Sequence, residues 1–192
     1  AVLENKDRLL FSLKYSKDFF NKNKKIIENR RIKKIEVVNR KVIDAETKNN
    51  FHQGVIIKSQ TLQKKDINSI SEDEKLIVIL DSLNDSQNVG SILRTSYLFG
   101  IKTVIFNKDN SLEVNPFLIK AASGAYEKIN LIEVINLNRT IEILKKKGFW
   151  ILGLDVKSEK NLTSIPRDIK KAVIFGSEGK GIRSLILKNC DY

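Results

Sequence analysis

Short apolar runs alternate with amphipathic segments over the C-terminal two thirds of the chain. Residues 76–80 (LIVIL) form an unbroken, partly β-branched apolar run, which is typical of a strand buried on both faces of a parallel sheet. In the segment that follows, apolar residues recur at helical spacing. The same alternation predicts strands at 76–80, 102–106, 130–134, 149–154 and 172–175, and helices at 88–99, 115–122, 137–147 and 181–188. The predicted fold class is therefore α/β, with helices on both sides of a parallel sheet.

The first 66 residues predict a separate, smaller α/β domain. Their pattern indicates helix 1–10, strand 11–14, helix 16–30, strand 34–38, helix 39–47 and strand 53–58. Residues 60–75 are polar, charged and contain serines, so we expect a linker at 67–75. The larger domain then occupies 76–192.

The segment between strand 76–80 and the next helix carries candidate chemistry, because it contains Asn88, Gly90 and Arg94. Ligands of open α/β sheets bind in the crevice at the carboxyl ends of the strands. An arginine one turn into the helix suits a phosphate or carboxylate there. The alternative is a polar turn with a solvent-exposed arginine, and this loop alone does not decide between the two.

A glycine-rich loop at 176–181 (GSEGKG) follows the apolar run 172–175. Three glycines in six residues allow a sharp bend and a close approach to a ligand, with backbone N–H groups as donors. The spacing is neither GxxxxGK[ST] nor GxGxxG, which disfavours a triphosphate and a dinucleotide.

Together the two segments resemble the SpoU (TrmH-type) family of RNA ribose 2′-O-methyltransferases. The first is similar to the family's Asn-x-Gly-x-x-x-Arg-Thr motif, found here as Asn88, Gly90, Arg94 and Thr95. The second is similar to its Gly-x-Glu-Gly-x-Gly motif, found here as Gly176, Glu178, Gly179 and Gly181. Segments 109–127 and 148–155 also resemble family segments, and FHQGV at 51–55 is typical of the branch with bacterial 23S ribosomal RNA guanosine methyltransferases.

The resemblance implies a SPOUT-type methyltransferase domain with a C-terminal trefoil knot, and a small L30-like N-terminal domain that binds the RNA substrate. It implies S-adenosyl-L-methionine as cofactor and methylation of a ribose 2′-hydroxyl in structured RNA, foremost 23S rRNA. It also implies a cytoplasmic protein that is a homodimer when full length. Two alternatives stay open: a tRNA substrate, and a non-catalytic RNA-binding or ribosome-assembly role on the same scaffold.

The resemblance assigns Arg94 as the essential residue, which orients the RNA phosphate and assists deprotonation of the hydroxyl. A guanidinium stays protonated near neutral pH and is a poor base, so positioning with electrostatic stabilisation of the developing alkoxide is the simpler physical role. Asn88 would fix the loop, and Glu178 would orient Arg94 or a residue across the dimer. The implied cofactor-binding residues are Gly153, Leu154, Phe175, Gly176 and Gly181.

The family's third motif normally follows a Cys-Asp pair, whereas here the sequence stops at Cys190-Asp191-Tyr192. The first five residues resemble the middle of a family helix. We therefore expect a chain trimmed at both ends, with an incomplete knot, weak binding of S-adenosylmethionine and poor dimerisation.

Charge is concentrated at the N-terminal end. Residues 1–70 hold 17 Lys+Arg against 8 Asp+Glu, whereas residues 71–192 hold 18 against 15. This asymmetry is the footprint of a phosphate-backbone partner, although a lysine-rich solvated surface is the alternative. Arg30 and Arg31 favour phosphate geometry, so we expect RNA contact there.

The single histidine, His52, is predicted to shape a turn or to contact RNA. One histidine and one cysteine disfavour a zinc site, which needs four clustered ligands, so no metal is expected. One cysteine cannot form an internal disulfide, which fits a reducing cytoplasm. No apolar run reaches the length of a membrane span, so no membrane partner is expected.

Overall fold

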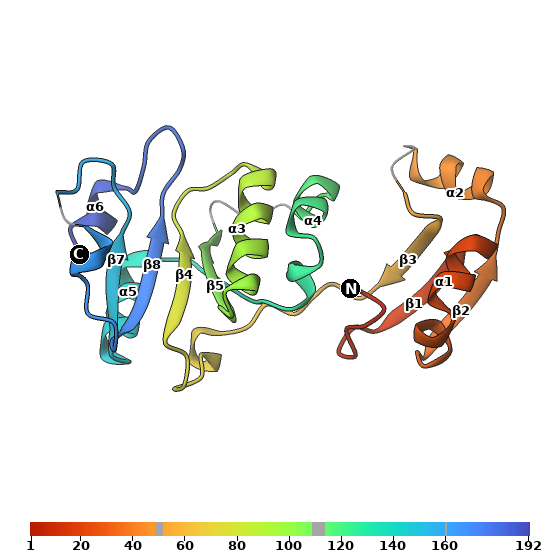
Figure 1. Cartoon of the computed structure of the whole chain (residues 1–192), viewed down its shortest axis with the longest axis horizontal. Helices are drawn as coiled ribbons and strands as arrows, with labels where there is room; N and C mark the ends of the chain where they lie inside the picture. Colours follow the sequence, from red (N-terminus) through yellow and green to blue (C-terminus); the bar gives the residue numbers. More distant parts are fainter. Residues whose placement is uncertain (49–51, 109–113, 160) are drawn as a thin grey trace. The chain divides into compact units, whose positions relative to one another are not determined.

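The computed structural model describes residues 1–48, 52–108, 114–159 and 161–192. It divides the chain into two compact units, Ala1–Gln63 and Lys64–Tyr192 (Figure 1).

Unit 1 is a three-stranded mixed sheet with two helices. Its elements are β1 (Leu10–Tyr15), α1 (Lys17–Glu28), β2 (Ile32–Val37), α2 (Arg40–Thr47) and β3 (Val55–Ser59). The strand order is β2-β1-β3, with β1 parallel to β2 and antiparallel to β3. Leu13 of the central strand is fully buried, and the ring of Tyr15 stacks on Phe20 of α1 at 5.2 Å between centroids. The core of unit 1 therefore lies between β1 and α1.

The predicted helix over residues 1–10 is wrong. Residues 2–8 form turns and a bend, and β1 begins at Leu10. The N–H groups of Glu4 and Asn5 both donate to the Ala1 carbonyl, and the Asn5 side chain then accepts from Asp7 N at 3.1 Å. This Asx-type bond closes a turn instead of extending a helix, a competition that Asn favours.

Unit 2 is a five-stranded, wholly parallel sheet with the strand order β6-β5-β4-β8-β7, so the predicted α/β class is confirmed. Its elements are η1 (Ile67–Ser69), β4 (Leu76–Leu80), α3 (Ser86–Leu98), β5 (Thr103–Asn107), α4 (Pro116–Ala122), η3 (Ala125–Glu127), β6 (Asn130–Val134), α5 (Leu137–Lys146), β7 (Phe149–Gly153), η4 (Leu162–Ser164), β8 (Lys170–Phe175) and α6 (Ser184–Leu187). Each of the five predicted strands is present. The helix predicted at 181–188 is shorter, because Gly181 has a φ of 66° and the helix starts only at Ser184.

Both faces of this sheet are buried, as the apolar strand runs predicted. Ile77 and Ile79 pack into one core cluster with α5 and α6, whereas the alternate residues Val78 and Leu80 are buried on the opposite face, the side of α3 and α4 (Figure 1). Helices on both sides are the arrangement that a parallel sheet requires.

The segment expected as a linker contributes to unit 2. Ile70 is buried in the core cluster, and Thr103 Oγ1 donates to the buried Glu74 carboxylate at 3.0 Å. Just before it, Lys65 N donates to the Leu131 carbonyl of the edge strand β6 at 3.1 Å. Packing against β5 and β6 therefore outweighs the polar composition of the segment.

Residues 190–192 lie along the other edge strand, β7. Asp191 N donates to the Ile151 carbonyl at 2.8 Å, and Gly153 N donates to the Tyr192 carbonyl at 2.9 Å. The Asp191 carboxylate accepts from Ile151 N at 2.8 Å. Cys190, one residue earlier, packs against the core cluster.

None of the helices among the described residues is long and apolar enough to span a bilayer.

Gly90 lets α3 approach α4. A Cβ atom there would lie 2.6 Å from Ala121 Cβ and 2.7 Å from the Leu118 carbonyl oxygen. We expect Gly90→Ala to lower the free energy of unfolding by about 1–2 kcal/mol, since overpacking outweighs the gain in helix propensity. Gly179→Ala is the control, because its Cβ would meet nothing within 4 Å. Urea unfolding measures both, and equal stability of the two variants would contradict the close packing.

Burial, followed by the negative charge of Asp191, raises the pKa of the Cys190 thiol to about 11, against a smaller lowering by Lys145. Only the thiolate reacts with iodoacetamide, so we expect alkylation of the folded chain at pH 8 to be about a hundredfold slower than that of the urea-denatured chain. The rate should rise about tenfold per pH unit towards pH 11. Similar rates for folded and denatured chains would refute the raised pKa. The chain has one cysteine, so the label is unambiguous.

Candidate functional site

The candidate site lies where the central strands β4 and β8 end. These strands are parallel neighbours, so the loop into α3 and the glycine-rich loop leave the same edge of the sheet. The chain proceeds from β4 to β5 on one side, while β8 lies on the other side. Ligands of open α/β sheets bind at such a switch point, and we call this place between the two loops the crevice. Asp85 caps α3 here, because its carboxylate accepts from Asn88 N at 2.7 Å.

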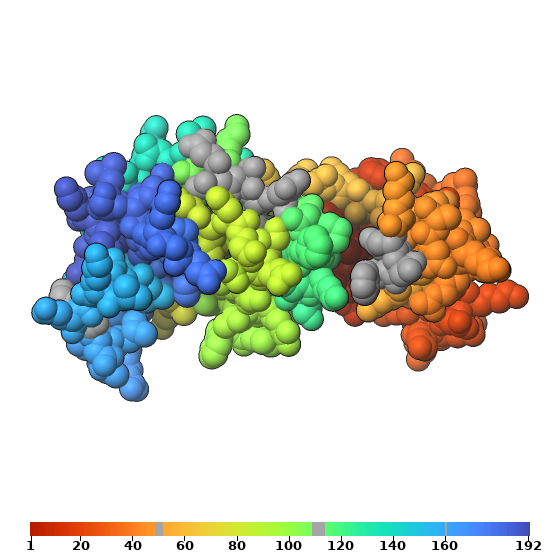
Figure 2. All heavy atoms as spheres, turned by 90° about the horizontal axis from the view of Figure 1, so that it is seen from above, coloured from red at the N-terminus to blue at the C-terminus, as the bar shows by residue number. Residues whose placement is uncertain are grey.

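Asn88 and Glu178 are in contact at this edge of the sheet. The Asn88 side-chain amide donates to Glu178 Oε2 at 3.3 Å, a pairing between residues 90 positions apart in sequence. Figure 2 shows the blue loop after β8 beside the yellow-green α3. Two of the three expected catalytic residues are thus brought together.

Arg94 lies elsewhere on α3 and is exposed. It follows Asn88 by six residues, which places it about 120° away around the helix axis. Ser86, Gly90 and Arg94 are four residues apart in turn, so they lie on one face of the helix. Ser86 accepts from Asn115 Nδ2 at 2.7 Å and Gly90 packs on α4, so this stripe is the α4 side of the helix. Among the described residues Arg94 has no hydrogen-bond or ion-pair partner. Glu178 therefore makes no contact that would orient Arg94 within one chain.

The glycine-rich loop is closed on itself. Ser177 N donates to the Gly181 carbonyl at 3.0 Å, and Gly181 N returns a bond to the Ser177 carbonyl at 2.8 Å. A Cβ at Gly176 would lie 2.1 Å from the Gly181 carbonyl carbon. Lys180 N donates to Ser177 Oγ at 3.2 Å. Several of the N–H groups expected as ligand donors are therefore used within the loop, and Gly176 and Gly181 shape it.

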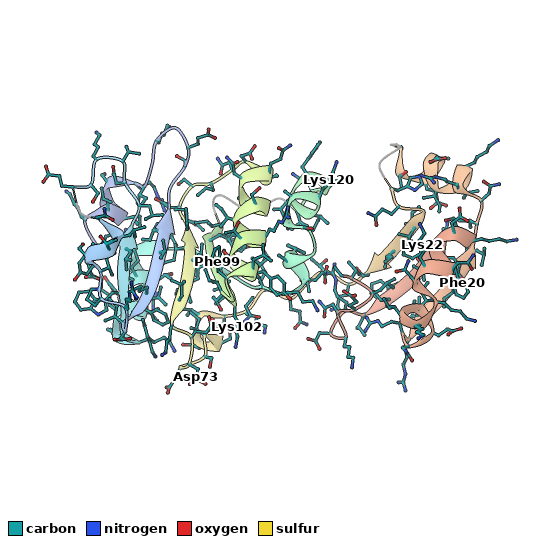
Figure 3. The ribbon with its side chains drawn as sticks, viewed as in Figure 1. Phe20, Lys22, Asp73, Phe99, Lys102 and Lys120 are labelled. Carbon is teal, nitrogen blue, oxygen red and sulfur yellow. The ribbon has the colours of Figure 1, made fainter. Side chains whose placement is uncertain are left out.

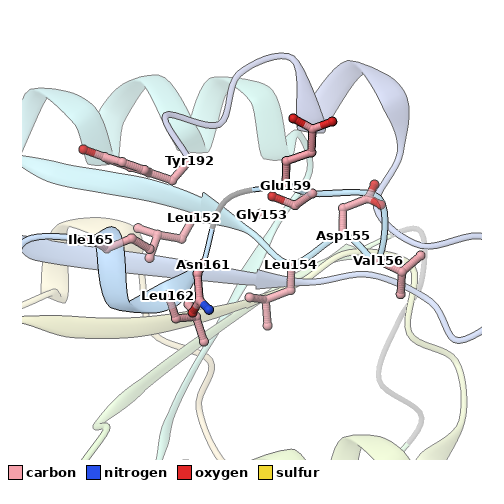
Figure 4. A pocket seen from close by; sticks show the side chains of 11 residues that line it. Leu152, Gly153, Leu154, Asp155, Val156, Glu159, Asn161, Leu162, Ile165 and Tyr192 are labelled. Carbon is pink, nitrogen blue, oxygen red and sulfur yellow. The ribbon is translucent and has the colours of Figure 1, made fainter.

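A cavity of about 530 Å³ lies at the carboxyl end of β7 (Figure 4). Its lining is mixed apolar and polar, and consists of Leu152, Gly153, Leu154, Asp155, Val156, Ser158, Glu159, Asn161, Leu162, Ile165 and Tyr192. Two of the expected cofactor residues, Gly153 and Leu154, line it. Phe175, Gly176 and Gly181 do not, although Leu154 N donates to the Ile174 carbonyl at 3.2 Å and so lies beside the end of β8.

One ion pair at this edge was not predicted from the sequence. The Asp81 carboxylate, directly after β4, is fully buried and accepts from Arg183 N at 2.8 Å and from Arg183 Nε at 2.7 Å. A charged residue immediately after a buried strand is the one signal that could have indicated it, since a buried carboxylate needs partners.

The RNA-binding candidates of unit 1 differ in their surroundings. Arg31 is exposed, whereas Arg30 donates from its guanidinium to the Arg8 carbonyl at 2.7 Å and is partly buried. The His52 side chain is 5% exposed; Gly54 N donates to its Nδ1 at 3.0 Å, and its Nε2 lies 2.5 Å from Asp44 Oδ1. His52 therefore supports the turn, the first of its two predicted roles. Phe51 of the FHQGV segment lies outside the described residues, as do residues 109–113 of the segment 109–127.

Within the described ranges, no group of three or more His, Cys, Asp and Glu side chains could hold a metal ion.

Comparison with known proteins identifies the larger unit. Residues 75–192 match the SpoU rRNA Methylase family. The 23S rRNA (guanosine-2′-O-)-methyltransferase RlmB of Coxiella burnetii is 36% identical over 150 residues, which cover 75% of this chain and 60% of that protein. The enzyme of the same name from Escherichia coli K12 is 33% identical over 162 residues, which cover 82% and 67%.

The chain thus spans about 60–67% of the length of these relatives. Among solved structures, the SpoU methyltransferase AviRb from Streptomyces viridochromogenes, in complex with AdoMet, matches with a TM-score of 0.82 at 16% identity, over 100% of this chain and 75% of that one. This likeness establishes the fold. Since one family accounts for more than half of its residues, the chain belongs to the SpoU rRNA methylase family.

Proposed function

We propose that this chain is part of an S-adenosylmethionine-dependent enzyme that methylates a ribose 2′-hydroxyl in 23S rRNA. The observation that carries the proposal is the Asn88–Glu178 contact at the carboxyl ends of β4 and β8, because it joins the two family motifs at one crevice. The printed names of the relatives with 33–36% identity supply the reaction and the RNA.

The cavity at the end of β7 fits the cofactor. Its volume lies in the range of small-molecule sites, its walls include Leu152, Leu154 and Ile165 for an apolar ring, and Asp155 and Asn161 offer polar atoms. The cofactor supplies an activated methyl group when bound. Leu154 N, which donates to the Ile174 carbonyl, fixes this wall against β8 and hence close to the crevice.

The residues of the crevice position the RNA. The Asn88 backbone is bonded to Asp85 and its side chain to Glu178, so the first turn of α3 is in contact with the glycine-rich loop. Within the described residues the Arg94 guanidinium has no partner, and we propose that it binds the RNA phosphate and stabilises the negative charge that develops on the 2′-oxygen. Glu178 accepts a hydrogen bond from Asn88. We therefore propose that it orients the first turn of α3, and that it does not orient Arg94 of its own chain.

Unit 1 is proposed as the L30-like RNA-binding domain. It carries most of the net positive charge of the chain, and Arg31 and Lys22 are exposed; Figure 3 shows Lys22 extending from α1. Arg30 has a different role, because its bond to the Arg8 carbonyl holds the segment before β1.

The full-length protein is proposed to be a cytoplasmic homodimer. Three consecutive apolar residues at the end of α3 are exposed: Tyr97 by 47%, Leu98 by 72% and Phe99 by 79%. Phe99 is labelled in Figure 3. A second copy that covers this patch would remove apolar area from water and place another chain beside α3, which carries Arg94. A ribosomal RNA substrate implies the cytoplasm.

Arg94→Ala in the full-length protein should lower the rate of methyl transfer to 23S rRNA by about 10²–10³, since one oxyanion-stabilising group is lost. Cofactor affinity should change less than about twofold, because Arg94 does not line the cavity. Incorporation of labelled methyl groups and calorimetric titration measure the two effects. Arg139→Ala, at an exposed arginine of α5, is the charge-matched control. Wild-type turnover by Arg94→Ala would refute the assigned role, and no transfer by the parent would refute the proposed function.

Arg31→Ala should weaken RNA binding and reduce the slope of log K against log salt by about 0.7–0.9, the value for one lost phosphate contact. Arg30→Ala should instead lower thermal stability, because the Arg8 carbonyl loses its partner. Filter binding between 50 and 200 mM salt and a thermal melt separate the two effects. An unchanged slope for Arg31→Ala would mean that this basic run is solvated surface.

A further inference from the structure

The Asp81–Arg183 pair joins the two segments that form the crevice. Asp81 and Asn88 flank the loop that leaves β4, and Glu178 and Arg183 belong to the segment that leaves β8. Two non-covalent contacts therefore connect the same two segments, the Asn88–Glu178 hydrogen bond and the Asp81–Arg183 ion pair. The second contact is the shorter, at 2.7 Å against 3.3 Å, and it joins two opposite charges.

Asp81 determines how the Arg183 side chain lies. Its Oδ2 accepts from the Arg183 backbone at 2.8 Å and its Oδ1 from Nε at 2.7 Å, while Ser82 Oγ donates to Oδ1 at 3.3 Å. A guanidinium is planar, so one bond through Nε together with the fixed backbone restricts where the two terminal nitrogens can lie. Ser82 has a φ of 62°, a value that directs the chain sharply away after the carboxylate.

The terminal nitrogens of Arg183 remain available. Within the part of the chain that the structure describes, they have no hydrogen-bond partner, and the side chain is 47% exposed. Asp81 pairs with Arg183 through Nε at 2.7 Å, so the bond uses none of the N–H groups of the two terminal nitrogens. A preorganised fork with unsatisfied donors is the form in which arginine binds phosphate.

We propose that Arg183 is an RNA phosphate-binding residue of the crevice and that Asp81 is the positioning residue that holds it. The proposal rests on the proposed function for the identity of the RNA. A phosphate is favoured over the carboxylate of the cofactor because Arg183 does not line the cavity at the end of β7, whereas its loop contacts Asn88 on the substrate side.

The test is the salt dependence of binding of transcribed 23S rRNA to the 192-residue chain. Arg183→Gln should raise the Kd about tenfold, as expected for a charge-assisted bond, and reduce the slope of log K against log salt by about 0.7–0.9. Arg167→Gln removes the same charge from an exposed arginine just before the start of β8, at the other end of that strand from the crevice. This variant should leave the slope unchanged. Arg183→Lys retains the charge and should keep the slope, but its Kd should still rise about threefold or more because the fork is lost.

Asp81→Asn distinguishes positioning from general destabilisation. It should raise the Kd in the parent chain and leave the slope unchanged, since Arg183 keeps its charge. In the Arg183→Gln background it should have no further effect on the Kd, because Asp81 acts through Arg183. Thermal melts show that each variant is folded.

An unchanged slope for Arg183→Gln would overturn the proposal and leave Arg183 as a structural residue. Should that variant not fold, equal RNA affinity of Arg183→Lys and the parent would overturn it as well. Loss of cofactor affinity with unchanged RNA binding would instead assign Arg183 to the cofactor carboxylate. Failure of methyl transfer by the full-length protein would refute the proposed function, while the salt slope would still decide whether Arg183 binds RNA.

Discussion

The parallel pairing of β4 with β8 is the constraint on which the candidate site depends. The register runs from Leu76 opposite Lys171 to Leu80 opposite Phe175, and Asp81 N extends it by donating to the Phe175 carbonyl at 2.8 Å. Parallel neighbours end at the same edge, so the strand pairing itself brings together two motifs about ninety residues apart. The hydrophobic burial of six residues of these two strands holds together the strand ends beside which Asn88 and Glu178 meet; they are Ile77, Val78, Ile79, Leu80, Ala172 and Ile174.

Much of the fold could be predicted from the sequence because the parallel sheet is buried on both faces. Such strands appear as apolar-rich runs that alternate with helical segments, and each of the five was predicted from this alternation. The N-terminal segment could not be predicted in this way. Leu3 and Leu10 are spaced like residues of a helix, but both are buried in the core around β1, and the Asn5 turn between them leaves no helix.

The sequence motifs predicted which segments form the site, but they did not predict which side chains contact one another. Asn88 and Glu178 were expected in one site, and they meet. The partner of a side chain across 102 residues, as in Asp81–Arg183, depends on the strand order, and no local pattern encodes it. The glycines expected to serve ligand binding also have a packing role that the sequence did not indicate. Gly90, Gly153 and Gly176 are each crowded by protein atoms within 3 Å of a virtual Cβ, so their small size serves helix, strand and loop packing before any ligand is considered.

Both edges of the five-stranded sheet are covered by short segments from outside it. Lys65 bonds to β6 on one side, with Lys64 paired to Glu133 beside it, and Asp191 and Tyr192 bond to β7 on the other. An uncovered edge strand offers a row of N–H and C=O groups to any other chain, and β-sheet aggregation begins by such addition. The covered edges leave few backbone groups for that reaction. These bonds disfavour extension of the sheet at both edges, so we expect association of this unit with RNA or with another protein through side chains on its loops and helices.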